Sequence, residues 1–317
     1  LHPRVRRQRQ MCIRDSLQSD IDRIEAAEDR DVGEYAAQNW NEFSIYLGGE
    51  SKFPNLHKQI PYPVDDSSIL PFYDLQAFLS SSDNSYLNTI NIIGNPFSYP
   101  YKAELMDLLY SIPVKKNFYL TASTACRFIK EIQQIDLPNY ELYIYYEQEE
   151  ASIHHILTEK QIPFHWIYLI SSEKQYEDLE KLETKYGNEY VEVHPIYTGD
   201  NLPFFEENVY LAEEDILQSN YDKQDIFAHQ VMNTNFWGRL SVLPDGKVYS
   251  NLNHPPLGTL KDRVYDLIVD EMTSKRAWRW IRDEVSPCKD CLFRYLCPSP
   301  SNYELVIGKP NLCHVKP

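Results

Sequence analysis

Residues 287–314 read PCKDCLFRYLCPSPSNYELVIGKPNLCH, and four of the six cysteines of the chain lie in this stretch. Cys288, Cys291, Cys297 and Cys313 follow the spacing C-x2-C-x5-C-x15-C. The two-residue gap between the first two lets one turn direct both sulfur atoms at one centre. Four thiolates at this spacing can satisfy the ligand positions of one iron–sulfur cluster or one tetrahedral zinc ion. We therefore predict a metal centre near the C-terminus.

The remaining cysteines, Cys12 and Cys126, lie far from this group in the sequence. A compact cysteine group in a chain of 317 residues is typical of an intracellular protein, in which thiols stay reduced and serve metals. Buried free cysteines or a disulfide pair are the alternative. Spacing does not separate an iron–sulfur cluster from zinc, because C-x2-C suits both.

The stretch and the residues before it resemble the SPASM domain, which follows the barrel of many radical SAM enzymes and holds two auxiliary [4Fe-4S] clusters. The family pattern has a cysteine after a β-hairpin, then G-x4-C, then C-x2-C-x5-C-x3-C, and a last cysteine. Here residues 238–251 (GRLSVLPDGKVYSN) predict the hairpin, because Asp-Gly between alternating residues is a strong turn signal. Three cysteines of this pattern are absent here. Ser250 and Asn251 stand after the hairpin, Arg263 stands at the cysteine of G-x4-C, and Ser301 stands at the last cysteine of C-x2-C-x5-C-x3-C.

This pattern of loss implies that one cluster is kept. In the family, auxiliary cluster II uses the three cysteines of C-x2-C-x5-C and the last one, which match Cys288, Cys291, Cys297 and Cys313. Auxiliary cluster I uses the positions that are altered here. The resemblance therefore implies one [4Fe-4S] cluster, and we expect protein side chains to fill the place of the other.

Residues 43–200 alternate between short apolar runs and amphipathic stretches. The runs predict strands at 43–47, 87–95, 116–123, 140–147, 164–172 and 190–197. The stretches predict helices at 73–81, 102–112, 125–135, 151–161 and 173–187. Strand–helix alternation predicts an α/β fold with a parallel sheet or barrel. With the resemblance, we expect a partial (β/α)6 radical-SAM-like barrel followed by a small cysteine-rich SPASM-like domain.

Radical SAM chemistry needs a C-x3-C-x2-C loop after the first strand, and residues 48–70 contain no cysteine. The second strand of such barrels usually ends in Gly-Gly-Glu, whereas this chain has Gly94-Asn95-Pro96. We interpret residues 48–50 (GGE), at the end of the first strand, as a turn. The barrel is therefore expected to be catalytically silent, with no SAM as cofactor.

The combination resembles the pseudo-radical-SAM proteins of Bacteroidales peptide-modification systems, especially those associated with Gly-Gly leader peptides. That resemblance implies an accessory subunit that works beside an active radical SAM/SPASM maturase on a ribosomal precursor peptide. Two alternatives stay open. One is a zinc-stabilised binding module, and the other is an enzyme that uses the barrel for non-radical chemistry. The second would need polar side chains where the strands end: Asn95, Ser123, Glu147, Ser172 and Tyr197.

Composition limits which partners the chain can have. A formal net charge of −16 argues against nucleic acid, and no apolar run approaches the ~18 residues needed to span a bilayer. A cytoplasmic protein is expected.

Residues 1–16, with five Arg and one Asp, resemble translated sequencing adapter and are not expected to belong to the fold. We expect a connector at 17–42, the barrel at 43–230 and the SPASM-like domain at 231–317.

Single residues are interpreted conservatively. Cys126 is expected to be a small buried apolar residue. His154 and His155 are expected at or near the surface, and His314 is a candidate neighbour of the metal centre. Residues 275–284 (KRAWRWIRDE) predict a helix that packs Trp inward, or an exposed aromatic and basic patch for a partner protein.

Overall fold

The computed structural model describes residues 38–315 except residues 50, 82–85, 148–150, 188–190 and 275. The predicted segment 1–16 and most of the predicted connector 17–42 lie outside the described residues. All six predicted strands are confirmed, and each pairs in parallel with the next. They are β1 (Glu42–Tyr46), β2 (Thr89–Ile93), β3 (Lys115–Thr121), β4 (Tyr140–Tyr145), β5 (Phe164–Ile170) and β6 (Val191–Pro195).

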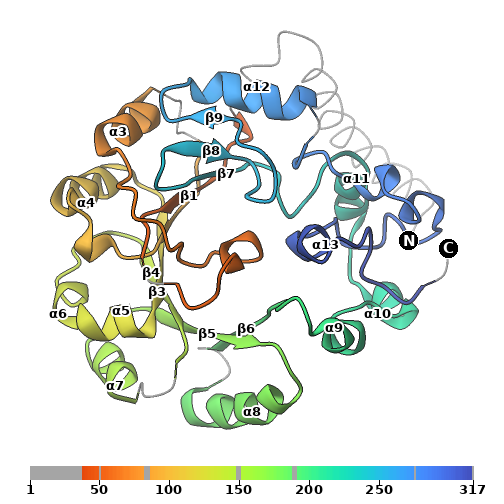
Figure 1. Ribbon diagram of the computed structural model, residues 1–317, viewed down its shortest axis with the longest axis horizontal. Helices are drawn as coiled ribbons and strands as arrows, with labels where there is room; N and C mark the ends of the chain where they lie inside the picture. Colours follow the sequence, from red (N-terminus) through yellow and green to blue (C-terminus); the bar gives the residue numbers. More distant parts are fainter. Residues whose placement is uncertain are drawn as a thin grey trace, which may run out of the picture.

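Helices connect these strands and cover the outer face of the sheet (Figure 1). They are α3 (Phe72–Ser80), α4 (Lys102–Ser111), α5 (Ala122–Arg127), α6 (Ile129–Ile132), α7 (Ala151–Glu159) and α8 (Lys174–Tyr186). The single helix predicted at 125–135 is wrong in one respect, because α5 and α6 are separated at Phe128, where the backbone leaves helical geometry (φ −112°, ψ 26°).

Alternate residues of the strands face two different cores. Phe43, Ile45, Phe118 and Leu120 belong to the large core under the helices. Tyr145 and other inward-facing residues belong to a smaller core on the inner face of the sheet. Both faces are covered, which is why the strands appear in the sequence as nearly continuous apolar runs.

The predicted hairpin is confirmed and continues the same sheet. Strand β7 (Arg239–Val242) pairs in parallel with β1, and β8 (Lys247–Tyr249) and β9 (Gly258–Thr259) follow as antiparallel neighbours. The nine strands take the order β6-β5-β4-β3-β2-β1-β7-β8-β9, so β6 and β9 are the edges of the described sheet. The fold is therefore α/β with a mostly parallel, open sheet.

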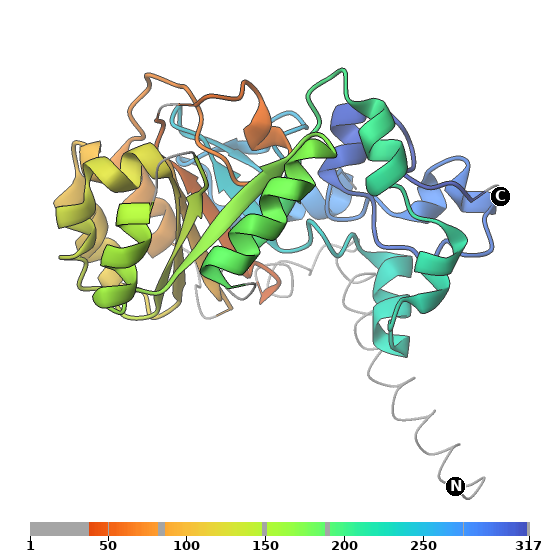
Figure 2. The ribbon, with the colours of Figure 1, turned by 90° about the horizontal axis from the view of Figure 1, so that it is seen from below.

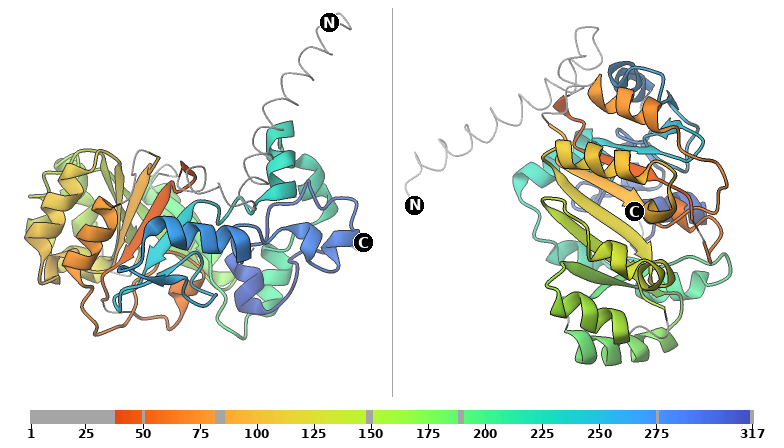
Figure 3. Two further views of the ribbon diagram at one scale, coloured as in Figure 1. Left: turned by 90° about the horizontal axis from the view of Figure 1, so that it is seen from above. Right: turned by 90° about the vertical axis from the view of Figure 1, so that its left-hand side faces the viewer.

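The remaining elements form a lobe beside the sheet (Figures 2 and 3). They are α9 (Leu202–Asn208), α10 (Glu213–Gln218), α11 (Lys223–Val231), α12 (Val264–Ser274), η4 (Arg282–Glu284), η5 (Cys288–Asp290) and α13 (Asn302–Ile307). Of these, α12 lies over the hairpin, and α13 reaches the end of β6 through a hydrogen bond from the Tyr303 hydroxyl to the Pro195 carbonyl (2.8 Å) (Figure 1). None of the described helices is long and apolar enough to cross a membrane.

The helix predicted at 275–284 is wrong. After α12 the chain turns, and Trp278 is completely buried with its indole N–H donating to the Arg239 carbonyl (3.1 Å). The inward packing of Trp278 is confirmed, but residues 276–281 form no helix, and only the last three residues of the segment form the 3-10 helix η4.

Candidate metal centre

The four predicted ligands line one pocket of the C-terminal lobe. Cys288 begins η5, and the Cys291 N–H donates to its carbonyl (2.9 Å), so one turn presents both sulfur atoms. Cys297 follows on the same loop. Cys313 arrives from the end of the chain, where it forms a parallel bridge with Leu211. The structure therefore brings together all four cysteines that the spacing had singled out.

The chemistry of these donors fits a thiolate-bound metal. Soft sulfur ligands select zinc or iron–sulfur clusters, and four of them complete either site. Among the described residues, no three Cys, His, Asp or Glu side chains stand ready to hold a single metal ion. Metal binding by these four cysteines therefore stays a prediction, which rests on the shared pocket and on the donor type.

Burial raises the pKa of two of these thiols, Cys297 and Cys288. Burial raises the pKa of Cys297 to about 11, and Cys313, Cys291 and Cys288 add to the increase. Burial also raises the pKa of Cys288, although Arg282 partly offsets this. A bound metal cation would supply the charge that favours their deprotonation.

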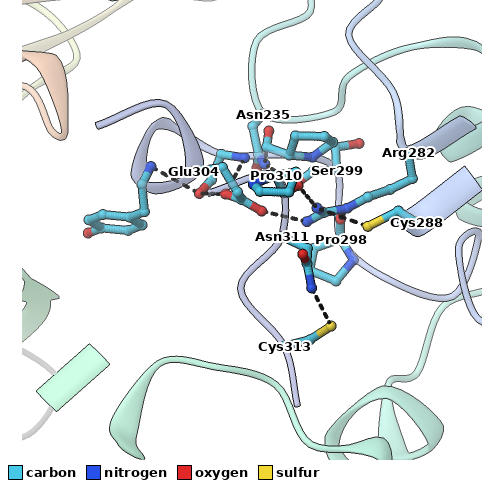
Figure 4. Close-up of polar contacts among 12 residues, drawn as sticks. Asn235, Arg282, Cys288, Pro298, Ser299, Glu304, Pro310, Asn311 and Cys313 are labelled. Atoms are coloured by element: carbon cyan, nitrogen blue, oxygen red, sulfur yellow. Dashed lines mark hydrogen bonds and ion pairs between the residues drawn. The ribbon is translucent and has the colours of Figure 1, made fainter. Parts of the chain in front are cut away.

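Arg282 lies at the centre of the polar contacts around this pocket (Figure 4). It is buried, and its guanidinium pairs with the carboxylate of Glu304 on α13 (2.7 Å). The sequence placed Arg282 in a possible surface patch, so its role here was missed. The capping box Ser301-x-x-Glu304, which begins α13, fixes the carboxylate, but it gives no sign in the sequence that Arg282 pairs with it.

The altered family positions are mostly filled by hydrogen-bonded protein side chains. Buried Ser250 donates to Glu271 (2.6 Å), and Asn251 donates to Asn302 (2.8 Å). Ser301 caps α13. These positions agree with the expectation.

Arg263 does not follow that expectation. Its side chain is exposed and forms a surface ion pair with Asp266 (2.7 Å). It therefore fills no buried site, because it lies at the surface directly before α12.

Glu271 gives a pH prediction for this region. Its buried carboxylate accepts hydrogen bonds from Ser250 and from the N–H groups of Ala277 and Trp278, and burial raises its pKa despite these bonds. A raised pKa means that this group stabilises the fold at low pH and loses that contribution as pH rises through the folded-state pKa. We expect Glu271→Gln, which stays neutral, to gain stability relative to the native protein between pH 5 and pH 8. Urea unfolding at the two pH values measures this, and a difference independent of pH would contradict it.

The loop after β1, where a radical SAM motif would stand, folds over the inner face of the curved sheet (Figure 1). We call residues 53–62 the plug; it includes the short helix η1 (Leu56–Lys58). The plug packs against inward-facing residues of the later strands. The resulting small core contains Leu56, Ile60, Tyr62, Tyr145, Ile167 and Ile196.

Polar side chains from both halves of the chain hold the plug. The Gln59 amide donates to the Tyr197 carbonyl and accepts from its N–H, both at 2.8 Å. Asn302 donates to the Gln59 carbonyl (3.1 Å), and Asn253 donates to the Lys58 carbonyl (2.8 Å). Asn302 also accepts a hydrogen bond from Asn251 (2.8 Å), so the plug is linked to the residues that follow the hairpin.

Gly48 and Gly94 follow β1 and β2 and lie in close contact. Both have positive φ (+72° and +111°), and a Cβ on Gly94 would lie 2.3 Å from the Gly48 carbonyl oxygen. The Asn95 side chain, in place of the second family glycine, caps the short helix η2 (Pro96–Ser98). Of the predicted GGE turn, residue 50 lies outside the described residues.

Gly94→Ala is therefore expected to cost roughly 3 kcal/mol of unfolding free energy, because it combines positive-φ strain with a backbone clash. Gly199→Ala is the matched control: Gly199 has φ +98°, but nothing lies within 4 Å of its added Cβ. Chemical denaturation of both variants separates strain from clash. Equal losses at the two sites would show that the packing of Gly94 contributes nothing.

The polar residues at the strand ends do not assemble into one site. Ser123 and Glu147 line an open cavity of about 890 Å3, and the Ser123 N–H donates to the Glu147 carboxylate (3.1 Å). Asn95 caps η2, Ser172 bonds to Gln175, and Tyr197 holds the plug. Ser123 and Glu147 share one cavity, whereas the described contacts of Asn95, Ser172 and Tyr197 lie elsewhere, so the five residues form no single constellation.

Other single-residue predictions have mixed outcomes. Cys126 is exposed, so its predicted burial is wrong. His154 is partly buried and accepts from the Trp166 indole (3.3 Å), as expected, and His155 is exposed. His314 is exposed, with Nε2 2.7 Å from the Glu206 carbonyl oxygen, and is not among the residues that line the cysteine pocket. Its ring contacts Glu206 of α9 instead.

Comparisons with known proteins give a likeness of structure only. No family model matches the chain, and no curated protein matches it. Among solved structures, it is similar to Streptococcus suis SuiB bound to precursor peptide SuiA, at 12% identity and a TM-score of 0.49, over 87% of this chain and 75% of that one. It is also similar to native anSMEcpe with bound AdoMet and Cp18Cys peptide, at 13% identity and a TM-score of 0.48, over 81% and 88%. At this level we draw nothing about activity from the likeness.

Proposed function

We propose that this protein is a catalytically silent accessory subunit of a ribosomal-peptide maturation system and binds one [4Fe-4S] cluster through Cys288, Cys291, Cys297 and Cys313. The observation that carries the proposal is the plug. The segment that would supply the SAM-binding cysteines has none, and its apolar residues Leu56 and Ile60 are buried against the inner face of the sheet.

The partner follows from the sequence resemblance. Pseudo-radical-SAM proteins of this kind imply an active radical SAM/SPASM maturase, its precursor peptide, or both, in the cytoplasm. The acidic character of the chain, with a formal net charge of −16, supports a protein or peptide partner over nucleic acid. The four cysteines would hold the cluster, and when bound it would supply a structural centre or a site for one-electron transfer.

An anaerobic assay tests the silence of the barrel. The purified chain is mixed with SAM and a strong reductant, alone and with a candidate maturase and its peptide. Alone, it is expected to cleave no SAM; with the maturase, it is expected to increase peptide modification. Cleavage of SAM by the chain alone would overturn the proposal.

A zinc-stabilised binding module is the second candidate. It is favoured by the same four-sulfur donor set, which completes a structural zinc site equally well. A cluster absorbs visible light and zinc does not, so the colour of the purified protein separates the two.

A further inference from the structure

Arg282 is a buried cation aimed at one of the predicted metal ligands. Its side chain is 8% exposed, and that of its ion-pair partner Glu304 is 3% exposed. The guanidinium also donates to the carbonyls of Pro298 (3.0 Å) and Pro310 (3.5 Å). Its Nη1 lies 3.9 Å from the Cys288 sulfur (Figure 4). One side chain therefore joins η4, the two loops that flank α13, α13 itself and the first cysteine.

We propose that Arg282 is the positioning residue of the metal centre: it orients Cys288 and offsets the negative charge of the loaded site, and Glu304 holds it in place. The proposal rests on the proposed function, because it needs a thiolate-bound metal at the four cysteines. Either an iron–sulfur cluster or zinc would meet that need.

The charge balance supports this role. Four thiolates around a dipositive ion or cluster core leave a net charge of about −2. An uncompensated charge of this kind is costly in a buried site. Arg282 supplies a positive charge next to one sulfur, and the Asn311 amide donates to another, Cys313 (3.1 Å).

The geometry requires arginine rather than any cation. A guanidinium presents several N–H donors in a fixed fork, whereas a lysine ammonium is a point charge on a flexible stem. Glu304 is itself fixed, because its other oxygen accepts from the N–H and the hydroxyl of Ser301 (2.9 and 2.5 Å). The carboxylate therefore sets where the arginine lies, and the arginine sets where the Cys288 sulfur lies.

For an iron–sulfur centre, the two members of the ion pair should change the reduction potential in opposite directions. Arg282→Gln removes positive charge beside the sulfur, so the reduced cluster becomes less favourable. The reduction potential should fall by at least 59 mV, which is a tenfold change in a one-electron equilibrium. Glu304→Gln removes the counter-anion and leaves the cation, so reduction becomes easier. The potential is measured by anaerobic redox titration of the full chain, followed by visible absorbance.

Arg294→Gln is the matched control. Arg294 lines the same pocket, but its guanidinium donates to the Cys291 carbonyl (3.1 Å) and pairs with Asp283 (2.7 Å), and its side chain is 31% exposed. The same change of charge is therefore screened by solvent, and a shift below threefold is expected. An equal shift at both arginines would overturn the specific role of Arg282.

The outcomes separate this inference from the proposed function. If the native chain holds iron, an unchanged potential in Arg282→Gln, or shifts of the same sign in Arg282→Gln and Glu304→Gln, overturns the inference alone. If Arg282→Gln does not fold, Glu304→Gln decides the matter. The inference is then overturned if the reduction potential of Glu304→Gln is not higher than that of the native chain. If the native chain holds zinc, the readout is zinc transfer to a chelator: at least tenfold faster transfer from Arg282→Gln supports the inference, and an unchanged rate overturns it. A native chain without metal overturns both.

Discussion

Replacing Cys291 by alanine is expected to release the metal and unfold the C-terminal lobe. Between residues 281 and 301 the described secondary structure consists of two three-residue 3-10 helices, η4 and η5. Such a loop buries little apolar surface, so it depends on its ligands for a fixed conformation. Structural four-ligand sites contribute on the order of 10 kcal/mol to the folding of small metal domains, and loss of one ligand removes a large part of this.

Metal analysis and thermal unfolding measure that effect, with Cys126→Ala as the control. Cys126 is exposed and lies outside the cysteine pocket, so its replacement should leave metal content and melting unchanged. A Cys291→Ala protein with native metal content and a native melting curve would refute the ligand assignment.

Leu56→Ala is expected to destabilise the protein by about 2 to 5 kcal/mol. Leu56 is 2% exposed in the plug and packs in the small core inside the strands. Its truncation removes buried methyl groups and leaves a cavity that its neighbours fill incompletely. The loss of this packing should weaken the attachment of the plug, which then depends more on hydrogen bonds such as that from Asn302 of α13. Hydrogen exchange of residues 53–62 should therefore become faster as well.

Leu217→Ala is the matched control for this change. Leu217 lies on α10 and is 59% exposed, so the same truncation should cost less than about 0.5 kcal/mol. Urea unfolding of both variants, at equal metal content, gives the comparison. Equal small losses would mean that the plug is not a packed part of the fold, and the structural basis for a silent barrel would be lost.

The architecture was predictable because its local signals agree with the tertiary structure. The strands are buried on both faces, and therefore appear as short apolar runs with helices between them. The hairpin was predictable because Gly246 has φ +80°, which the Asp-Gly pair accommodates. The group of cysteines was predictable because three come from one loop, where sequence spacing approximates distance in space.

What the sequence did not reveal depends on contacts between distant segments. Arg282 is buried because Glu304, twenty-two residues later, neutralises it, and no local pattern shows that pairing. The plug was missed because its apolar residues, Leu56, Ile60 and Tyr62, are scattered among polar ones. They are buried by strands more than eighty residues away, such as the one that ends at Tyr145. The position of Cys313 likewise depends on a bridge to Leu211.

The most direct test of the metal centre is its composition. The full chain is purified without oxygen, and iron, acid-labile sulfide and zinc are measured per polypeptide. A single [4Fe-4S] site on Cys288, Cys291, Cys297 and Cys313 predicts about four iron and four sulfide, with no zinc. One zinc without sulfide, or a chain free of metal, would contradict the iron–sulfur assignment.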